Sequence, residues 1–218
     1  MKIWSIKKGF TSDHSSTSYE FLAVDKPLSK TDKDKISMLS RRVSPTSYRS
    51  SFVYNVDGYD IPGGWENLMK NYYDVMYSVD YDWWTLAIAF NTTKEQFKKL
   101  KEFEFRGHED LGIDIEGDEN RVIVTIYCVV DDDVCYDIEN EYATSSRKNG
   151  KDDGLLNFLE EIRELLIKGD YRALYAVWDE YYVDEAEDSD VERPEEPEVY
   201  DEDDKGIIED FKNLLTCV

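Results

Sequence analysis

The chain has 218 residues, enough to bury the core of one large domain or of a domain with a small second one. Hydrophobic residues make up 41% of it and aromatic residues 14%, which excludes a disordered composition. The formal charge of −23 argues against ordinary nucleic-acid binding by the whole surface, because carboxylates repel phosphate backbones. Such acidity either attracts basic partners or serves solubility alone.

Targeting and redox signals favour a soluble, cytoplasmic protein. No apolar run of signal-peptide length follows the N-terminal lysines, and no stretch approaches the roughly 20 apolar residues of a membrane helix. Cys128, Cys135 and Cys217 contain no close pair and only two histidines accompany them, which predicts reduced thiols and no zinc site. We therefore expect no cofactor and no membrane association.

The charge is distributed unevenly along the chain. Residues 1–50 carry 10 basic and 5 acidic side chains, a net charge of +5. The next segment, 51–150, has a net charge of −12, and the last, 151–218, has −16. This asymmetry predicts that the C-terminal third attracts a basic surface, either the first 50 residues or another protein.

A Ser/Thr-rich leader at residues 1–18 precedes the first clear structural signal. The short apolar run Tyr19–Val24, bounded by Asp-Lys-Pro, predicts a buried strand. Ser29 then has the properties of an N-cap, with Asp32 three residues later, and opens a mostly exposed helix to about Arg42.

The middle of the chain alternates between strand and helix patterns. Ser51–Val56 predicts a second strand, and apolar residues at helical spacing from Trp65 to Met76 predict a helix at 64–77. Trp83–Phe90 predicts a central strand. It begins with two tryptophans that point to opposite faces, so we expect the core to take at least one ring and leave the other for a binding surface.

A capping box at Thr92–Glu95 opens the next helix, and Gly112–Glu116 with Arg121–Val130 predict a hairpin. From Tyr19 the order is strand, helix, strand, inserted helix, strand, helix, strand, strand. This order favours a ferredoxin-like α+β fold, an antiparallel sheet with the inserted helix at 64–77. Another antiparallel sheet with helices on one face is the alternative.

The last third is helical and acidic. Leu155–Ile167 predicts an amphipathic helix, and Gly169 and Asp170 connect it to a second helix, Tyr171–Tyr182, as a helical hairpin. The expected divisions are a leader at 1–18, an α+β domain at 19–145, a helical hairpin at 150–183, an acidic linker at 184–204 and a C-terminal helix at 205–218.

Aromatic side chains of the second helix of the hairpin are the first candidate site. One helix packing through one face cannot bury all of them, so we expect an exposed, partner-binding set. The candidate residues are Tyr171, Tyr175, Trp178, Tyr181 and Tyr182.

Two weaker candidates follow from charge. Asp131 and Asp133 come directly after a strong strand, where oxygen-ligated Mg²⁺ binds in many proteins, although we favour an acidic turn, as expected in a chain with 49 acidic residues. The basic residues Arg41, Arg42 and Arg49 are interleaved with aromatic residues, which could hold a nucleic-acid backbone and stack bases.

Three stretches carry a family resemblance: YEFLAVDKPLS at 19–29, PTSYRSSF at 45–52 and KGDYRALYAVW at 168–178. Together they resemble an uncharacterised prokaryotic protein family whose members lie near genes for SWIM zinc-finger proteins. The leader is similar to a Ser-rich GFxSNSSSxSF start found on assorted bacterial proteins. This resemblance implies domain boundaries and no chemistry.

The function that the sequence favours is a non-catalytic acidic interaction or adaptor protein that binds a basic protein partner. One alternative is a metal-dependent hydrolase or nuclease using Asp131 and Asp133. Another is an RNA-binding module that the acidic tail inhibits. Whether the chain is an enzyme stays open, and we do not expect nucleic acid as the main partner.

Overall fold

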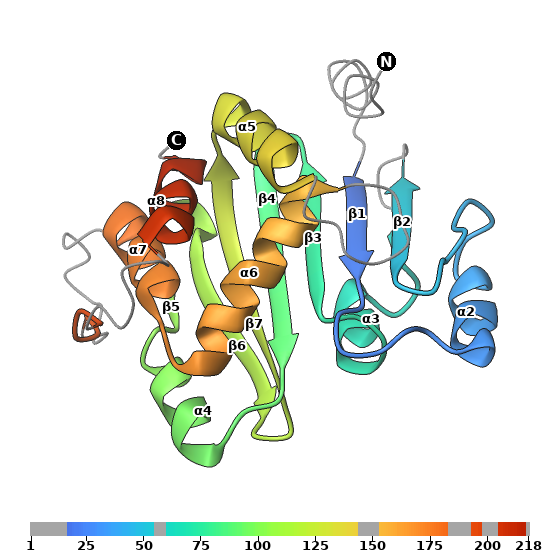
Figure 1. The fold of residues 1–218 in the computed structure, drawn as a ribbon, viewed down its shortest axis with the longest axis horizontal. Helices are drawn as coiled ribbons and strands as arrows, with labels where there is room; N and C mark the ends of the chain where they lie inside the picture. The colour runs from blue at the N-terminus through green and yellow to red at the C-terminus, as the bar shows by residue number, and fades with distance from the viewer. Residues whose placement is uncertain (1–16, 55–59, 144–152, 183–192, 198–204, 217–218) are drawn as a thin grey trace.

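The computed structural model describes residues 17–54, 60–143, 153–182, 193–197 and 205–216, apart from the side chain of His108. These residues form an antiparallel sheet with helices on both faces, which confirms the α+β class (Figure 1). The expected leader, nearly all of the acidic linker and Cys217 lie outside the described residues.

The sheet has the strand order β2-β1-β3-β4-β7-β6-β5, and the short β8 pairs with the end of β7. Its strands are β1 Thr17–Leu22, β2 Arg49–Tyr54, β3 Val75–Asp80, β4 Trp83–Phe90, β5 Phe105–Arg106, β6 Gly112–Asp118, β7 Arg121–Val130 and β8 Leu215–Thr216. The long strands β4 and β7 pair over eight residues in the middle of the sheet. The helices are α2 Lys30–Ser37, α3 Trp65–Asn71, α4 Lys94–Lys101, the 3₁₀ turn His108–Asp110, α5 Asp132–Tyr142, α6 Gly154–Lys168, α7 Arg172–Tyr181 and α8 Lys205–Leu214.

The larger core lies on the sheet face that α5 to α8 cover, and Figure 1 shows α6 crossing this face diagonally. Strand alternation supplies the sheet side of this core, with Leu86, Ile88 and Phe90 of β4 fully or almost fully buried. The helix side comes from the apolar stripe of α6, in which Ile162 is completely buried. A continuous core therefore joins the last helices to the sheet, and the hairpin predicted at 150–183 does not pack as a unit of its own.

A smaller core lies on the other face, under α2 and α3. The same alternation turns Ala87 and Ala89 of β4 toward this face, where small side chains leave room for α3 to approach the sheet. The predicted Ser29 capping box is confirmed: the Ser29 hydroxyl accepts a hydrogen bond from the Asp32 backbone N–H at 3.1 Å. The box of α4 starts one residue later than expected, with Thr93 as the N-cap.

The predicted helix at 64–77 is wrong in its second half. Helix α3 ends at Asn71, and Met76 lies in the middle strand β3. Arg121 stops the helix by donating hydrogen bonds to the carbonyl oxygens of Met69 and Tyr73 at 2.6 to 3.0 Å. The apolar residues that follow are buried on both faces of the sheet, and a strand buried in this way has no alternating pattern in sequence.

Neither the ferredoxin-like topology nor the helical hairpin is confirmed. Strand β3 adds a central strand that the predicted order lacked, and all strand pairs are antiparallel. Helices α6 and α7 follow one another through Gly169, but α6 packs on α5 and the sheet, whereas α7 packs on α8 and β6. Across the described ranges, no helix combines the length and apolar character needed to cross a bilayer.

Candidate interaction surface on helix α5

Strand β7 leads directly into α5, and Asp131 forms the junction. Its Oδ1 accepts hydrogen bonds from the backbone N–H groups of Asp133 and Val134 at 2.9 and 3.0 Å. Its own N–H donates to the carbonyl oxygen of Leu214 at 3.0 Å, which ties the junction to the end of α8. Asp131 is therefore an N-cap, the role for which Asp is strongly preferred.

The surroundings of Asp131 give the metal hypothesis no additional ligands. In the part of the chain that the structure describes, no group of three or more His, Cys, Asp or Glu side chains comes together to hold a metal ion. The Asp133 side chain is exposed in the first turn of α5, where a carboxylate is favourable beside the positive end of the helix dipole. Local helix chemistry thus accounts for both residues, and the hypothesis stays a prediction.

Helix α5 is held rigidly against its neighbours. Cys135 and Ile138 are buried in the larger core, and burial raises the pKa of the Cys135 thiol to about 12. A Cβ atom on Gly154 would lie 2.3 Å from the Glu139 carbonyl oxygen, so only glycine allows α6 to start so close to α5. The Gly154 N–H also donates to Glu139 Oε2 at 2.7 Å. These contacts fix which face of α5 points outward.

The outward face of α5 is acidic with one aromatic residue. Its exposed residues are Asp132, Asp133, Tyr136, Asp137 and Glu141. Three of the carboxylates repeat every four residues, so they lie in one row along the helix, and Tyr136 projects beside them. The tyrosine is 47% exposed, which is high for such a large side chain. Because α5 contains no Lys, Arg or His, this surface has one sign of charge.

This row of carboxylates does not help α5 to fold. Asp133 and Asp137 form a like-charge pair at i, i+4, and Asp137 and Glu141 form a second, each destabilising by about 0.2–0.5 kcal/mol. Glu141 also lies in the last turn, where the helix dipole disfavours an anion. The row of carboxylates therefore lowers the stability of α5 slightly.

The neighbouring helices expose charges of both signs. Helix α5 packs on α6, which exposes Glu164, and on α8, which exposes Glu209 together with Lys205 and Lys212. The Tyr142 hydroxyl donates to Asp210 Oδ2 at 3.2 Å and links the end of α5 to α8. Figure 1 shows these helices together on one side of the sheet. The surface therefore belongs to a layer of several helices.

The expectation of an exposed aromatic set on α7 is wrong for three of its five residues. Tyr171, Trp178 and Tyr181 are buried in the larger core. Trp178 Nε1 donates to the Phe103 carbonyl oxygen at 2.9 Å. The cause is that α7 lies against both the sheet and α8, so more than one side of the helix is covered.

The remaining two aromatic residues of that set, Tyr175 and Tyr182, are half-buried. The Arg193 guanidinium lies 4.9 Å from the Tyr175 ring centroid and pairs with Asp179. Tyr182 packs on Trp178, with ring centroids 4.7 Å apart. Each of the two already has a partner within the chain, and a role for them in binding another protein stays a prediction.

The predicted basic cluster does not form one surface. Arg49 is buried and donates through Nη2 to Asn157 Oδ1 at 2.8 Å, whereas Arg41 and Arg42 are exposed after α2. Phe52, expected to stack with bases, is 1% exposed and lies in the smaller core. Arg49 and Phe52 are three residues apart in β2, so they point to opposite faces of the sheet.

Sequence reasoning missed α5 and with it Tyr136, because the run of three aspartates was interpreted as an acidic turn. A signal was present. Asp131 has the properties of an N-cap, and Val134, Cys135 and Ile138 repeat at helical spacing.

The two tryptophans at the start of β4 differ in exposure. Trp84 packs on Tyr77 with ring centroids 5.7 Å apart, whereas Trp83 is 42% exposed.

Comparison of the chain with protein-family models, with curated proteins and with solved structures gives no match. The family resemblance at residues 19–29, 45–52 and 168–178 therefore stays a prediction. Any functional proposal rests on the geometry and electrostatics of the described residues.

Proposed function

We propose that this protein is a non-catalytic interaction protein, and that the acidic face of α5 binds a basic surface of a partner protein. The observation that supports the proposal is the row Asp133, Asp137 and Glu141 beside the exposed Tyr136, on a helix that these charges destabilise. The α+β framework holds this row in a fixed orientation. On this account the acidity has a specific role beyond solubility.

Charge and aromatic contact contribute differently to such binding. The carboxylates speed the encounter with a basic partner and orient it, which makes the association rate sensitive to salt. Tyr136 supplies contact area, because tyrosine is enriched among the residues that dominate interface energies. The partner therefore carries Lys or Arg residues around a pocket or groove that accepts an aromatic ring.

The alternatives retain less support. A hydrolase using Asp131 and Asp133 would have to recruit an N-cap carboxylate that already accepts two backbone hydrogen bonds. An RNA-binding module would have to work without Arg49, which is buried. Both alternatives predict ligands that can be tested directly, Mg²⁺ in the first case and RNA in the second.

The test is affinity capture of the partner from the native cell, repeated with variants of the full chain. Asp133→Asn with Asp137→Asn removes two charges from the row, and Tyr136→Ala removes the ring. Glu95→Gln with Glu119→Gln is the matched control, because both residues are exposed. Glu95 belongs to α4 and Glu119 to the turn between β6 and β7, and Figure 1 shows α4 at the end of the sheet away from α5.

The proposal requires a stoichiometric partner that the row variant and Tyr136→Ala each lose and the control retains. Raising the salt from about 50 to 500 mM should also release the partner, because the Debye length falls below about 10 Å in this range. Equal capture by all variants would contradict the proposal. Micromolar Mg²⁺ binding that Asp131→Asn removes would favour the hydrolase, and tight RNA binding would favour the RNA-binding module.

A further inference from the structure

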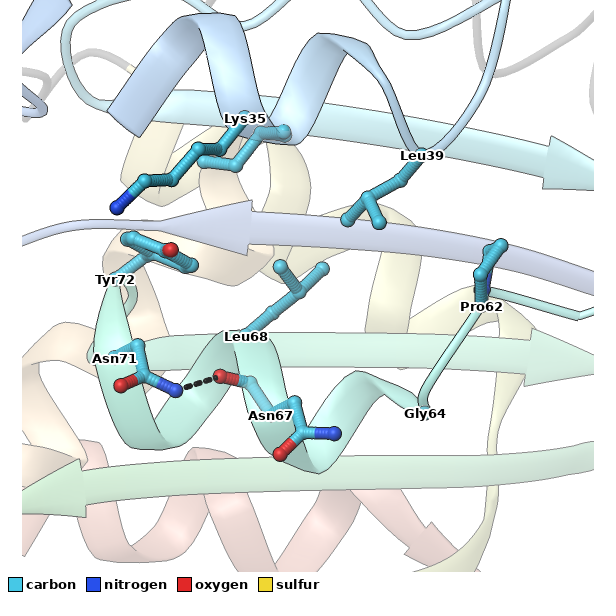
Figure 2. Close-up of a pocket in the computed structure, with 9 residues that line it drawn as sticks. Lys35, Leu39, Pro62, Gly64, Asn67, Leu68, Asn71 and Tyr72 are labelled. Carbon is cyan, nitrogen blue, oxygen red and sulfur yellow. Dashed lines mark hydrogen bonds between the residues drawn. The ribbon is translucent and has the colours of Figure 1, made fainter. Parts of the chain in front are cut away.

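A hollow of about 180 Å³ lies between α2 and α3, on the sheet face opposite the acidic helices. Its floor is apolar: Ile36 and Leu39 approach from the α2 side, and Leu68 rises from α3. Figure 2 shows Leu39 and Leu68 pointing toward each other across the hollow. The Lys35 side chain extends along its edge, and both Lys35 and Tyr72 line the hollow (Figure 2).

A second hollow, of about 350 Å³, lies next to the first. The two share Asn71 and Tyr72 as lining residues, so both adjoin the C-terminal end of α3. The second hollow is polar, and its lining includes Lys26, Lys70 and Arg121. We refer to the two hollows together as the groove, with an apolar compartment and a polar compartment.

The two carboxylates of the polar compartment are already engaged within the fold. Asp74 Oδ2 accepts hydrogen bonds from the backbone N–H groups of Val24 and Asp25, and its Oδ1 accepts one from Arg121 at 3.0 Å. Asp25 accepts a two-pronged hydrogen bond from Arg163, with both oxygens 2.8 Å from Nη2. Each carboxylate is therefore paired with an arginine, and neither contributes an uncompensated negative charge to the hollow.

The lysines of the groove are paired less firmly within the fold. The pKa of Asp32 is lowered mainly by its hydrogen bond with Ser29, and Lys35 and Lys26 lie close enough to lower it further, so this exposed carboxylate offsets part of their charge. Lys26 and Lys35 form no salt bridge among the described residues, and Lys70 forms only an exposed one with Glu116 at 3.3 Å. Exposed pairs of this kind contribute little to stability. In a chain with a net charge of −23, these lysines create a local site for an anion.

We propose that this groove binds a small amphipathic anion, consisting of a ring-sized apolar group that carries a carboxylate or a phosphate. The apolar compartment suits a ring, because an engineered apolar cavity of about 150 Å³ in another protein binds benzene. The ring occupies the space between Leu39 and Leu68. The acid group lies beside Tyr72, where the ammonium groups of Lys35 and Lys26 offset its charge.

The experiment titrates the isotope-labelled full chain with four probes and follows the amide and methyl resonances by NMR. Phenylacetate and phenyl phosphate carry both the ring and the charge. Benzyl alcohol carries the ring alone, and inorganic phosphate the charge alone. We expect saturable shifts at Leu39, Leu68, Asn71 and Tyr72 for at least one acid, with binding about tenfold tighter than for either half-probe. The tighter acid identifies a carboxylate or a phosphate as the preferred group.

The lysines to be replaced are exposed, and Leu39 is half-buried at the edge of the smaller core. Lys35→Glu with Lys26→Glu should weaken binding of the acid by about tenfold or more, and Leu39→Phe should block the ring. Lys94→Glu with Lys98→Glu, an equal charge change on α4, should have no effect. The proposal is overturned if neither acid saturates below about 10 mM, if benzyl alcohol binds as tightly as the acids, or if this control weakens binding as much as the groove variants.

Discussion

At the scale of single residues, the same side-chain type serves different purposes within one short segment. Asp131 caps α5, whereas the side chain of Asp137, six residues later, is exposed and forms no hydrogen bond or ion pair with the other residues that the structure describes. Composition alone cannot distinguish these roles, because both residues belong to a chain in which 49 of 218 residues are acidic. Hydrogen-bond geometry distinguishes the two roles, and so does the effect on stability of replacing each residue.

Replacing Asp131 tests its role as an N-cap. Asp131→Ala should lower the free energy of unfolding by about 1 kcal/mol, because two backbone N–H groups lose their acceptor. Asp131→Asn should be nearly neutral, since Asn caps helices as well as Asp does. Urea denaturation of both variants measures the difference. If Asn destabilises as much as Ala, the negative charge beside the positive end of the helix dipole, and not the capping hydrogen bonds, is what Asp131 contributes.

The buried thiols predict a loss of stability at alkaline pH. Burial raises the pKa of Cys135 from 9.0 to about 12 and that of Cys128 even further. Below pH 9 both thiols are protonated whether the chain is folded or not, so they do not affect stability there. Between about pH 9 and 12 the unfolded chain loses thiol protons that the folded chain retains, and stability falls as the pH rises.

Two measurements check this prediction in a Cys217→Ser background, which leaves only the two buried thiols. At pH 8 the native protein should react with a thiol reagent far more slowly than the urea-unfolded chain. The free energy of unfolding should decline from pH 8.5 to 10.5. Rapid reaction of both thiols under native conditions would show that α5 does not cover them.

At the scale of secondary-structure elements, α5 combines a well-anchored inner side with an outer side that opposes helix formation. Asp137→Asn removes both like-charge pairs of the row and should stabilise the protein by about 0.4–1 kcal/mol. Asp132→Asn, the same chemical change in the first turn, should destabilise slightly, because it removes a favourable interaction with the helix dipole. Thermal melts at low salt compare the two. A destabilising Asp137→Asn would contradict the account of the row.

Two glycines at the ends of α6 should respond to alanine for different reasons. Gly169 has a φ of +88°, and nothing lies within 4 Å of an added Cβ. Gly169→Ala should therefore lower the free energy of unfolding by about 1–2 kcal/mol, because alanine is strained in the left-handed conformation. Gly154→Ala should lower the free energy of unfolding by more, because its Cβ would clash with the Glu139 backbone. This clash should outweigh the higher helix propensity of alanine. The midpoints of urea unfolding measure which of the two variants loses more stability. A harmless Gly154→Ala would mean that α5 and α6 do not touch as described.

Local signals in the sequence predict several elements, and tertiary contacts decide the others. The Ser29 cap, the strand Trp83–Phe90 and the hairpin that ends in Val130 all follow from short-range chemistry. Met76 belongs to a strand although its spacing fits a helix, because Arg121, distant in sequence, ends α3 first. The burial of Trp178 likewise depends on Phe103, which no local pattern links to it.

At the scale of the whole molecule, the uneven charge of the sequence becomes an uneven distribution over the fold. The basic N-terminal segment supplies α2, Lys26 and Lys35 on one face of the sheet, and a later segment adds Lys70. On the other face, α5 carries five carboxylates and no basic residue, whereas much of the acidic sequence after residue 182 lies outside the described residues. The groove and the acidic surface are therefore separate, and a small anion and a basic protein could occupy them independently.

The most direct test of the central claim measures stability and partner capture on the same variant, Asp137→Asn. The account predicts a protein that is more stable than the wild type by up to about 1 kcal/mol and that captures less of its basic partner at low salt. The control, Glu95→Gln with Glu119→Gln, should capture the partner fully. Undiminished capture by Asp137→Asn, with its stability raised, would show that the row of carboxylates on α5 is not the binding surface.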